Sequence, residues 1–272
     1  MKTDPTDPLS VLVRQVQASA KYAVISPDLV RSIGEQELGK RRGLKEAVKA
    51  TRNKLHQVGS AFQETPIPYA QFLHELTELP PQMTDPVTLS GLKRFMGYHA
   101  STRERLPILE RIFNEALASI APIRSVLDIA CGLNPLAIPW MPLSKTCTYL
   151  ALDIYSNMVD FLNQYFEKYA LNGHAAVADV LQALPTQPVH LAMILKTLPC
   201  LEQINKLAGQ QLLENIQAEN MLVSFPAHGL AGRSKGMLQN YEAHFRELTA
   251  GKPWQIQRFE FPGELIFLVH KG

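Results

Sequence analysis

The sequence predicts an α/β fold in which a mostly parallel, doubly wound seven-stranded sheet follows an N-terminal helical domain. Beyond residue 120, short aliphatic and β-branched runs alternate with segments of helical periodicity, which is typical of parallel βαβ units. The last two runs are separated only by Pro262-Gly263-Glu264, which is too short for a parallel crossover and therefore predicts an antiparallel hairpin. Up to about residue 90, by contrast, the apolar residues recur at helical spacing only.

The N-terminal domain is expected to begin with a helix over residues 9–22, where apolar residues recur at helical spacing. Ser26-Pro27-Asp28 has the composition of a second helix start, with a capping serine and a proline in the first turn. The clearest helix is predicted from Leu44 to Phe62. Its apolar stripe recurs every seven residues, at Val48, Leu55 and Phe62.

A group of prolines follows this helix and divides the chain into short pieces: Pro66, Pro68, Pro80, Pro81 and Pro86. We therefore expect a domain junction in this stretch. The boundaries that follow are an N-terminal helical domain over residues 1–88 and a sheet domain over residues 89–272.

The sheet domain is expected to open with a helix through residues 95–100 and a second over residues 103–119. The candidate strands are Ser125–Ala130, Thr148–Asp153, Ala175–Ala178, His190–Leu195, Met221–Phe225, Ile256–Phe261 and Leu265–Val269. Between the strands, helices are clearest over 158–169 and 201–217. A mostly parallel sheet with a terminal antiparallel hairpin is typical of the Rossmann-like fold of S-adenosylmethionine-dependent methyltransferases.

Composition excludes several classes of protein. No apolar run approaches the ~20 residues of a membrane helix, and no signal-peptide core follows the N-terminus. The three cysteines, Cys131, Cys147 and Cys200, have neither CxxC nor zinc-site spacing, so no metal site is expected. An odd number of unpaired cysteines favours a reducing, cytoplasmic location.

The distribution of charge is more informative than its total, which is only +2. The first 56 residues contain 11 Lys and Arg against 6 Asp and Glu, whereas the remaining residues contain 16 against 19. A basic N-terminal part on a slightly acidic body indicates an anionic partner for that part.

Acidic and small residues end three consecutive candidate strands, where an open α/β sheet binds its ligand. The first ends in Asp128-Ile-Ala-Cys-Gly132, whose Ala130 and Gly132 allow close approach of a ligand. Asp153 ends the second strand and is suited to two ribose hydroxyls, and Asp179-Val180 follows the third and suits an adenine ring. The turn lacks the three glycines that a dinucleotide needs, which favours S-adenosylmethionine, a cofactor without phosphate.

Several longer strings occur together around these strand ends. They are HASTRER (His99 to Arg105), LDIACGLNP (Leu127 to Pro135), SFP (Ser224 to Pro226), GR-x-x-GM-x-x-NY (Gly232 to Tyr241), KLH (Lys54 to His56) and LK-x-LP-x-LE (Leu195 to Glu202). With them, most of the chain resembles the aminoglycoside-resistance 16S rRNA methyltransferases, which modify guanine N7 in the decoding site.

The resemblance implies an N-terminal rRNA-docking domain and a C-terminal methyltransferase domain. By motif, His99, Ala100, Ser101 and Arg105 would line the methionine end of the cofactor, with Arg105 paired to its carboxylate. Ala130 and Gly132 would form the floor, Asp153 would bind the ribose, and Asp179 and Val180 the adenine. Phe62 stands where many relatives have a tyrosine, which puts a role for a hydroxyl there in doubt.

Methyl transfer to guanine N7 needs no general base, because N7 carries a lone pair and no proton. The enzyme must align N7, the methyl carbon and the sulfur. Such alignment lowers the activation barrier by on the order of 7–11 kcal/mol. The base is expected to be turned out of its helix. The candidates for positioning it are Lys196, Arg233 and Met237, with Lys235 as a further phosphate contact.

The expected docking face follows from helical spacing. Lys45, Lys49, Arg52 and His56 are 4, 3 and 4 residues apart and therefore share one side of the predicted helix. Lys40, Arg41 and Arg42 precede that helix, Lys21 ends the first one, and Lys54 lies in the KLH string. We expect these cations to track the phosphates of 16S rRNA within the 30S subunit. Neither a membrane nor an obligate protein partner is expected.

Three alternatives stay open at this point. The first is methylation of another rRNA atom, such as adenine N1 in the same region. The second is a small-molecule methyltransferase, whose extra domain should be an apolar lid rather than a helix with a cationic stripe. The third is a non-catalytic RNA-binding protein that keeps the fold, against which the intact strand-end acids argue.

Overall fold

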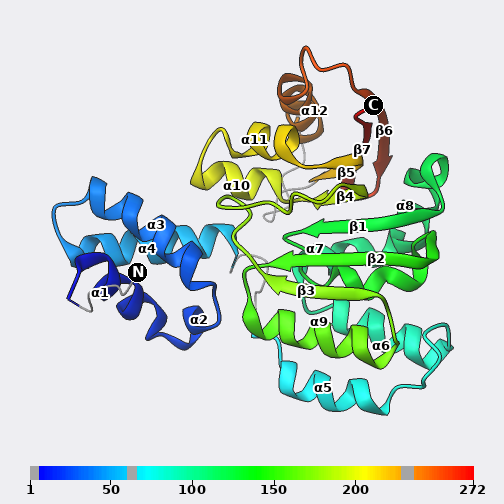
Figure 1. The fold of residues 1–272 in the computed structure, drawn as a ribbon, viewed down its shortest axis with the longest axis horizontal. Coiled ribbons are helices and arrows are strands. Elements are labelled where there is room, and N and C mark those ends of the chain that lie inside the picture. The colour runs from blue at the N-terminus through cyan, green and yellow to red at the C-terminus, as the bar shows by residue number, and fades with distance from the viewer. Residues whose placement is uncertain (1–5, 60–65, 228–235) are drawn as a thin grey trace.

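The computed structural model describes residues 6–59, 66–227 and 236–272. A helical bundle formed by the N-terminal residues lies beside a larger body built on one sheet (Figure 1). None of the helices in the described ranges is long and apolar enough to cross a membrane.

The bundle consists of α1 (Pro8–Gln17), α2 (Ala20–Ala23), α3 (Pro27–Lys40) and α4 (Leu44–Val58). The stretch expected as one helix over residues 9–22 is divided, because the chain leaves helical geometry at Ser19. Leu12 from α1, Ile33 from α3 and Leu55 from α4 are completely buried at the centre of the bundle. Helices α1 and α3 pack closely at Gly34, where an added Cβ would lie 2.5 Å from Leu12 Cδ2.

The sheet has seven strands in the order β3-β2-β1-β4-β5-β7-β6. Its strands are β1 (Ile123–Ile129), β2 (Leu143–Asp153), β3 (Gly173–Val177), β4 (Val189–Leu195), β5 (Ala218–Pro226), β6 (Gln255–Phe261) and β7 (Glu264–His270). The first five are parallel, and β7 runs antiparallel between β5 and β6. The predicted fold class, including its terminal hairpin, is confirmed. Strand order reverses between β1 and β4, which is where such sheets bind ligands.

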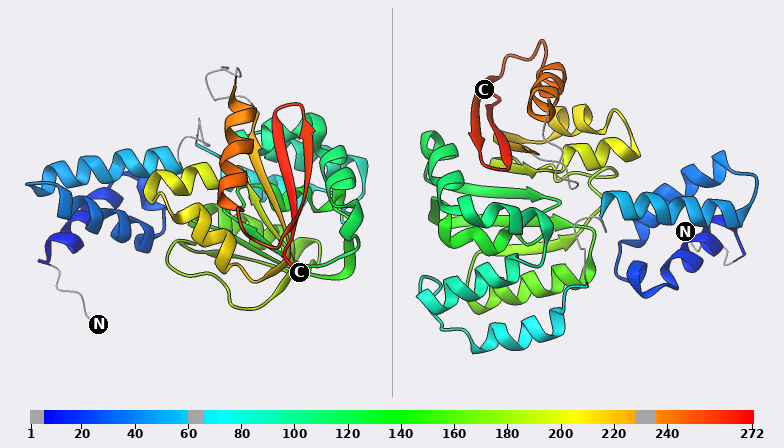
Figure 2. Two further views of the ribbon diagram at one scale, coloured as in Figure 1. Left: turned by 90° about the horizontal axis from the view of Figure 1, so that it is seen from above. Right: turned by 180° about the vertical axis from the view of Figure 1, so that it is seen from behind.

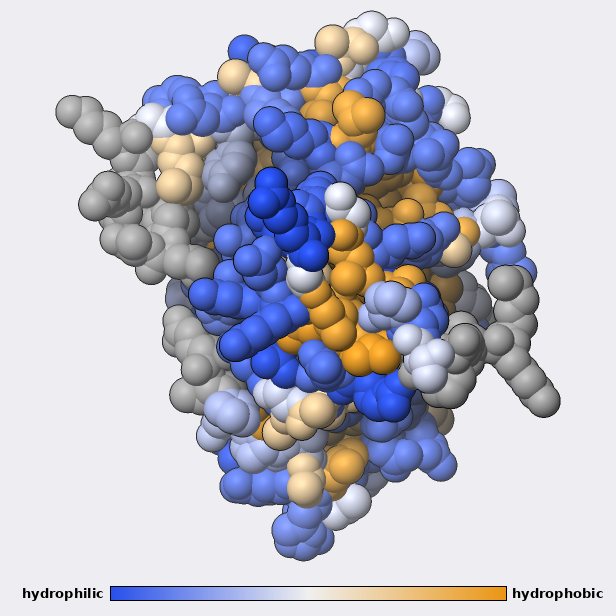
Figure 3. Space-filling view, turned by 90° about the vertical axis from the view of Figure 1, so that its left-hand side faces the viewer, coloured by the Kyte–Doolittle hydropathy of each residue, from blue (hydrophilic) through white to orange (hydrophobic). Residues whose placement is uncertain are grey.

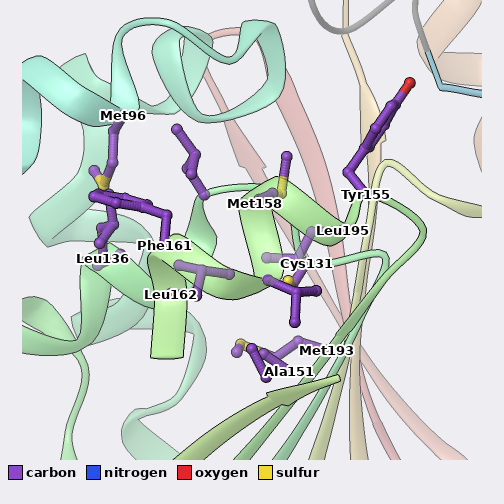
Figure 4. Close-up of a cluster of buried hydrophobic side chains, with 14 of the residues drawn as sticks. Met96, Cys131, Leu136, Ala151, Tyr155, Met158, Phe161, Leu162, Met193 and Leu195 are labelled. Atoms are coloured by element: carbon purple, nitrogen blue, oxygen red, sulfur yellow. The ribbon is translucent and has the colours of Figure 1, made fainter. Parts of the chain in front are cut away.

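Helices cover the sheet on both faces (Figure 2). On one face, Met158, Phe161 and Leu162 of α9 (Ser156–Lys168) pack over Ala151 and Met193 in a buried cluster (Figure 4). On the other, α10 (Leu198–Ile204), α11 (Ala208–Asn215) and α12 (Met237–Leu248) cover a second cluster. The short helices α7 (Ala100–Arg105) and α8 (Leu109–Ala116) lead into β1.

The helices α5 (Tyr69–Glu78) and α6 (Pro86–Met96) lie with the sheet and not with the bundle (Figure 1). The Lys168 ammonium of α9 donates to the carbonyls of Thr77 and Leu79, at 3.1 and 2.9 Å. The Phe72 ring of α5 lies 5.8 Å from that of Phe161. The boundary expected at residue 88 falls inside α6, the second of these two sheet-covering helices. We propose instead that the division lies between α4 and α5.

Candidate functional site

A pocket opens at the carboxyl ends of β1, β2 and β4, beside the reversal in strand order. Its walls also include residues that follow β3 and the start of α10. Eight of the residues that the sequence assigned to the cofactor or the target base line it: His99, Ser101, Arg105, Ala130, Asp153, Asp179, Val180 and Lys196. Residues up to 97 positions apart in the chain are thus gathered in one place.

The turn after β1 shows why a glycine is required there. Gly132 has φ +53°, a conformation that L side chains rarely adopt. An added Cβ would also lie 2.7 Å from Cε1 of the His99 ring, and the Gly132 amide donates to Asp153 Oδ2 at 2.8 Å. Ala130 has φ +50° in the same turn. The glycine therefore lets His99, the turn and Asp153 pack together at one end of the pocket.

Asp153 is held in place by the backbone around it. Besides the Gly132 amide, the amides of Ile154 and Tyr155 donate to its Oδ1, at 2.7 and 3.3 Å. Burial raises the pKa of this carboxyl, and the three amides oppose that rise. A carboxylate fixed by amides keeps further lone pairs for hydroxyl donors.

One carboxylate oxygen of Asp179 has no hydrogen-bond donor among the described residues. The Leu181 amide donates to its Oδ1 at 3.0 Å, whereas its Oδ2 is buried and has no hydrogen-bond partner among the described residues. Burial raises the pKa of this carboxyl as well. A buried acceptor of this kind is costly unless a ligand donates to it.

Arg105, which also lines the pocket, forms a buried ion pair with Glu264, each with 1 % of its side chain exposed. Nη2 of Arg105 donates to Oε1 of Glu264 at 2.7 Å, and Nε donates to Oε2 at 3.2 Å. Nη1 donates to Asn134 Oδ1 at 3.2 Å. Because a guanidinium has five N–H groups, two have no acceptor among the described residues and are available to a ligand carboxylate.

Lys196 belongs to the same network. Its ammonium lies 2.7 Å from Glu104 Oε2 and 3.6 Å from Glu264 Oε2, and its backbone is left-handed with φ +59°. Burial alone would raise the pKa of Glu264, but the charges of Arg105 and Lys196 outweigh it and hold that pKa below its usual value. Lys196 is therefore an internal partner of two carboxylates and not a solvated strand end.

Asp128 and Tyr149 extend this hydrogen-bond network through Asn134. Asp128 Oδ2 accepts from the Tyr149 hydroxyl at 2.7 Å and from Nδ2 of Asn134 at 2.8 Å. Burial raises the pKa of Asp128 to about 7, although both donors oppose the rise. The amide of Asn134 is thus oriented by Asp128 on one side and Arg105 on the other. The sequence contained Asn134 within a motif but no signal for this role.

The His99 ring, at the methionine end of the expected cofactor, is buried. Burial lowers its pKa to about 4, assisted by the charges of Arg105, Arg103 and Lys196. The ring is therefore neutral at physiological pH. Ala100, its neighbour in the motif, is buried but does not line the pocket.

Comparison with known proteins matches residues 18–268 to one family model, described as "Ribosomal RNA methyltransferase (FmrO)". The chain belongs to the FmrO family of ribosomal RNA methyltransferases. Its curated relatives include a 16S rRNA (guanine(1405)-N(7))-methyltransferase from Micromonospora rosea, 34% identical over 97% of both chains. A relative of the same name from Serratia marcescens is also 34% identical, over 94% of this chain and 96% of that one.

Solved structures agree with this family assignment. The 16S rRNA methylase RmtF, crystallised with S-adenosyl-L-homocysteine, has a TM-score of 0.83 and 27% identity, covering 99% of this chain and 100% of that one. The 16S rRNA methylase RmtB has a TM-score of 0.81 and 29% identity, covering 97% and 98%. The similarity therefore includes both the helical bundle and the sheet of this family member.

Other residues expected at the active site of this FmrO-family chain lie elsewhere. Met237 begins α12, is half-buried and does not line the pocket. Phe62, Arg233 and Lys235 lie outside the described residues. Leu29, Gly59 and Tyr155 line the pocket without having been predicted, since nothing in the sequence separates them from ordinary packing residues.

The basic residues of the bundle divide into two groups. Several are engaged within the protein: Arg41 and Lys54 lie 3.2 and 3.7 Å from buried Glu37, and Arg52 Nη2 donates to the Gln15 carbonyl at 2.6 Å. Lys40 is also near Glu37, at 3.7 Å. Arg42, Lys45 and Lys49 are exposed and have no salt bridge to a described residue. Figure 3 shows this end of the molecule, where hydrophilic side chains cover most of the surface around a hydrophobic strip.

Lys21 and His56 meet between α2 and α4. The Lys21 ammonium donates to Nδ1 of His56 at 3.1 Å, and both side chains are exposed. This contact brings the cation at the end of the first predicted helix onto the face of α4. Lys21, Arg42, Lys45 and Lys49 are thus exposed cations of the predicted docking face that have no salt bridge to a described residue.

Proposed function

We propose that this enzyme transfers the methyl group of S-adenosylmethionine to N7 of guanine 1405 in 16S rRNA of the 30S subunit. One observation carries the proposal: near full-length similarity to relatives that bear this activity in their names. Modification of that guanine gives resistance to 4,6-linked aminoglycosides. Since ribosomal subunits are found in the cytoplasm, the enzyme would act there.

The residues of the pocket fit S-adenosylmethionine. Oδ2 of Asp179, which has no partner among the described residues, suits the adenine amino group, and Asp153 suits the ribose hydroxyls. Arg105 keeps two N–H groups for the methionine carboxylate, beside the neutral ring of His99. Space is made for the ligand by the left-handed turn at Ala130 and Gly132. When bound, this cofactor supplies an electrophilic methyl group on a sulfonium.

The chain has to orient the cofactor and the target base and to exclude water. No side chain has to remove a proton. Guanine N7 attacks through its lone pair, so its positive charge rises as that on sulfur disappears. Glu104 and Glu264 are neutralised by Lys196 and Arg105, so this network beside the pocket adds no net positive charge. Neutral His99 avoids adding a further positive charge. Alignment by the fixed pocket then supplies most of the acceleration.

The direct test treats 30S subunits with the enzyme and S-adenosylmethionine, then digests the 16S rRNA for mass detection of nucleosides. We expect a gain of 7-methylguanosine in the digest. Formation of 1-methyladenosine instead would support the adenine N1 alternative. Asp153→Asn, which removes one carboxylate without adding bulk, is expected to lose both S-adenosylhomocysteine binding and product. Replacement of the exposed Asp160 by Asn serves as its control.

A cellular test distinguishes the same alternatives. A susceptible bacterium that expresses the protein should grow on kanamycin and gentamicin but remain sensitive to apramycin. Resistance to apramycin would contradict guanine N7 modification. Using naked 16S rRNA beside assembled 30S subunits in the first assay shows whether the assembled particle is the substrate.

A further inference from the structure

One segment of the helical bundle contacts both loops that carry the strand-end acids of the pocket. It comprises residues 24–32, at the start of α3. The Ser26 amide donates to the Ile154 carbonyl at 2.8 Å, and the Ser156 amide donates to the Val24 carbonyl at 2.9 Å. These two hydrogen bonds enclose the short bridge between Ile25 and Tyr155. The bundle is thus paired with the backbone immediately after Asp153.

The same segment reaches the loop after β3. The side-chain amide of Gln182 donates to the Ser32 hydroxyl at 2.8 Å, three residues beyond Asp179. Between the two anchors, Leu29 is 3 % exposed and lines the pocket together with Val180. The segment therefore contributes Leu29 to the lining of the pocket and also joins its two acidic loops.

The end of α4 closes against the same region. Gly59 lines the pocket, and an added Cβ there would lie 2.6 Å from the hydroxyl oxygen of Tyr155. Figure 4 shows that this hydroxyl points away from the hydrophobic cluster under α9. The bundle thus touches the pocket at two places, through α3 and through the end of α4.

We propose that the 24–32 segment is the outer wall of the adenosyl pocket, and that cofactor binding and docking of the bundle on rRNA strengthen each other. The inference rests on the proposed cofactor and substrate. Its physical basis is that Leu29 contacts the ligand only while the bundle is seated on the two loops. If the cofactor binds more tightly when the bundle is seated, and rRNA also binds the seated bundle, then each ligand raises the affinity of the protein for the other by the same factor.

The first experiment titrates S-adenosylhomocysteine into the full-length protein by calorimetry. Leu29→Ala removes apolar contact area at the wall and is expected to weaken binding about tenfold. Leu38→Ala is the matched control, because Leu38 packs in the same helix but does not line the pocket. Leu29→Met restores bulk and should restore most of the affinity. Far-UV circular dichroism and thermal unfolding show that each variant is folded.

The loop anchor is tested separately. Gln182→Ala removes the donor to Ser32 and should weaken S-adenosylhomocysteine binding several-fold. Ser32→Ala should weaken binding to the same extent. The double variant should bind no more weakly than either single variant, because both substitutions remove the same hydrogen bond. Ser32→Thr keeps the hydroxyl and should bind like the wild type. A merely structural role would lower thermal stability without this pattern in affinity.

The coupling is measured as the affinity of the protein for 30S subunits with and without saturating S-adenosylhomocysteine. The wild type should bind subunits several-fold more tightly with the ligand, and Leu29→Ala should lose most of that gain. If folded Leu29→Ala binds the ligand with wild-type affinity, the 24–32 segment is not a wall of the pocket. If the wild type binds subunits equally well with and without ligand, the two binding events are not coupled. Failure of the wild type to bind S-adenosylhomocysteine would contradict the proposed cofactor instead.

Discussion

Arg105 and Glu264 lie 159 positions apart in the chain and form a two-point ion pair with 1 % of either side chain exposed. Arg105 comes from the last turn of α7 and Glu264 from the first residue of β7. The pair therefore fastens the terminal hairpin to the segment that precedes β1. It also leaves the guanidinium in one orientation at the pocket, assisted by Asn134.

Glu264→Gln should lower the free energy of unfolding by about 3–5 kcal/mol, because it leaves buried Arg105 and Lys196 without their shared carboxylate. The protein offers a control in Glu219, whose two carboxylate oxygens both accept from Nη2 of Arg124 on the surface. Glu219→Gln should change the free energy of unfolding by less than about 1 kcal/mol. Urea denaturation measures both. Equal effects would show that the buried pair contributes no more than the exposed one.

Gly132→Ala should abolish S-adenosylhomocysteine binding and destabilise the fold, because the new Cβ would lie 2.7 Å from the His99 ring at φ +53°. Backbone strain alone costs roughly 1–2 kcal/mol. Gly251 has φ +72° with no atom near its Cβ position, so Gly251→Ala isolates that strain. The effect on unfolding should be larger at Gly132 than at Gly251. Ligand binding that survived Gly132→Ala would contradict the assigned turn.

The positions of the strand-end acids were predictable from sequence because they depend on local order. Apolar runs mark buried strands, the carboxyl ends of parallel strands meet at one edge, and Asp153 and Asp179 follow such runs. The terminal hairpin was predictable for the same reason, since three residues permit only an antiparallel return. These features required no knowledge of side-chain contacts.

The partners of the charged residues were not predictable. Helical spacing placed Arg52 on the docking face, but its guanidinium donates to the Gln15 carbonyl of another helix. Arg41 and Lys54 are held by Glu37, whose burial depends on the packing of α3 against α4. Leu29 contributes to the pocket through a tertiary contact that leaves no periodic signal. Such roles depend on contacts between residues remote in the chain.

Asp128→Asn should make the free energy of unfolding less sensitive to pH. The folded-state pKa of Asp128 is about 7, above an unfolded value near 3.9, so the folded protein holds its proton more tightly. The stability contributed by this proton is complete at low pH and is lost as pH rises from about 4 to about 7. An asparagine keeps an acceptor for Tyr149 and Asn134 and cannot ionise.

The measurement is urea denaturation of Asp128→Asn and wild type at pH 5.5 and pH 8. From the linkage relation, the variant should gain about 2 kcal/mol relative to wild type between these values. The exposed Asp160→Asn should show no such gain. A constant difference between variant and wild type would mean that Asp128 does not titrate in this range.

Charge reversal on the exposed face of α4 should separate docking from cofactor binding. Lys45 and Lys49 are one helical turn apart, exposed and without a salt bridge to a described residue. Lys45→Glu with Lys49→Glu should weaken 30S binding by at least tenfold at low salt and leave S-adenosylhomocysteine affinity within about twofold. The reason is that phosphate contacts contribute affinity through counterion release, which a single ligand pocket does not use.

The salt dependence provides the decisive measurement for these cations. The slope of log affinity against log salt should become shallower by roughly one unit for each phosphate that the variant no longer neutralises. Lys145→Glu, which reverses an exposed cation on β2 of the sheet domain, is the control and should keep the wild-type slope. A double variant with a wild-type slope would remove α4 from the rRNA interface. If the double variant also failed to bind the ligand, its fold and not its docking face would be at fault, which thermal unfolding would show.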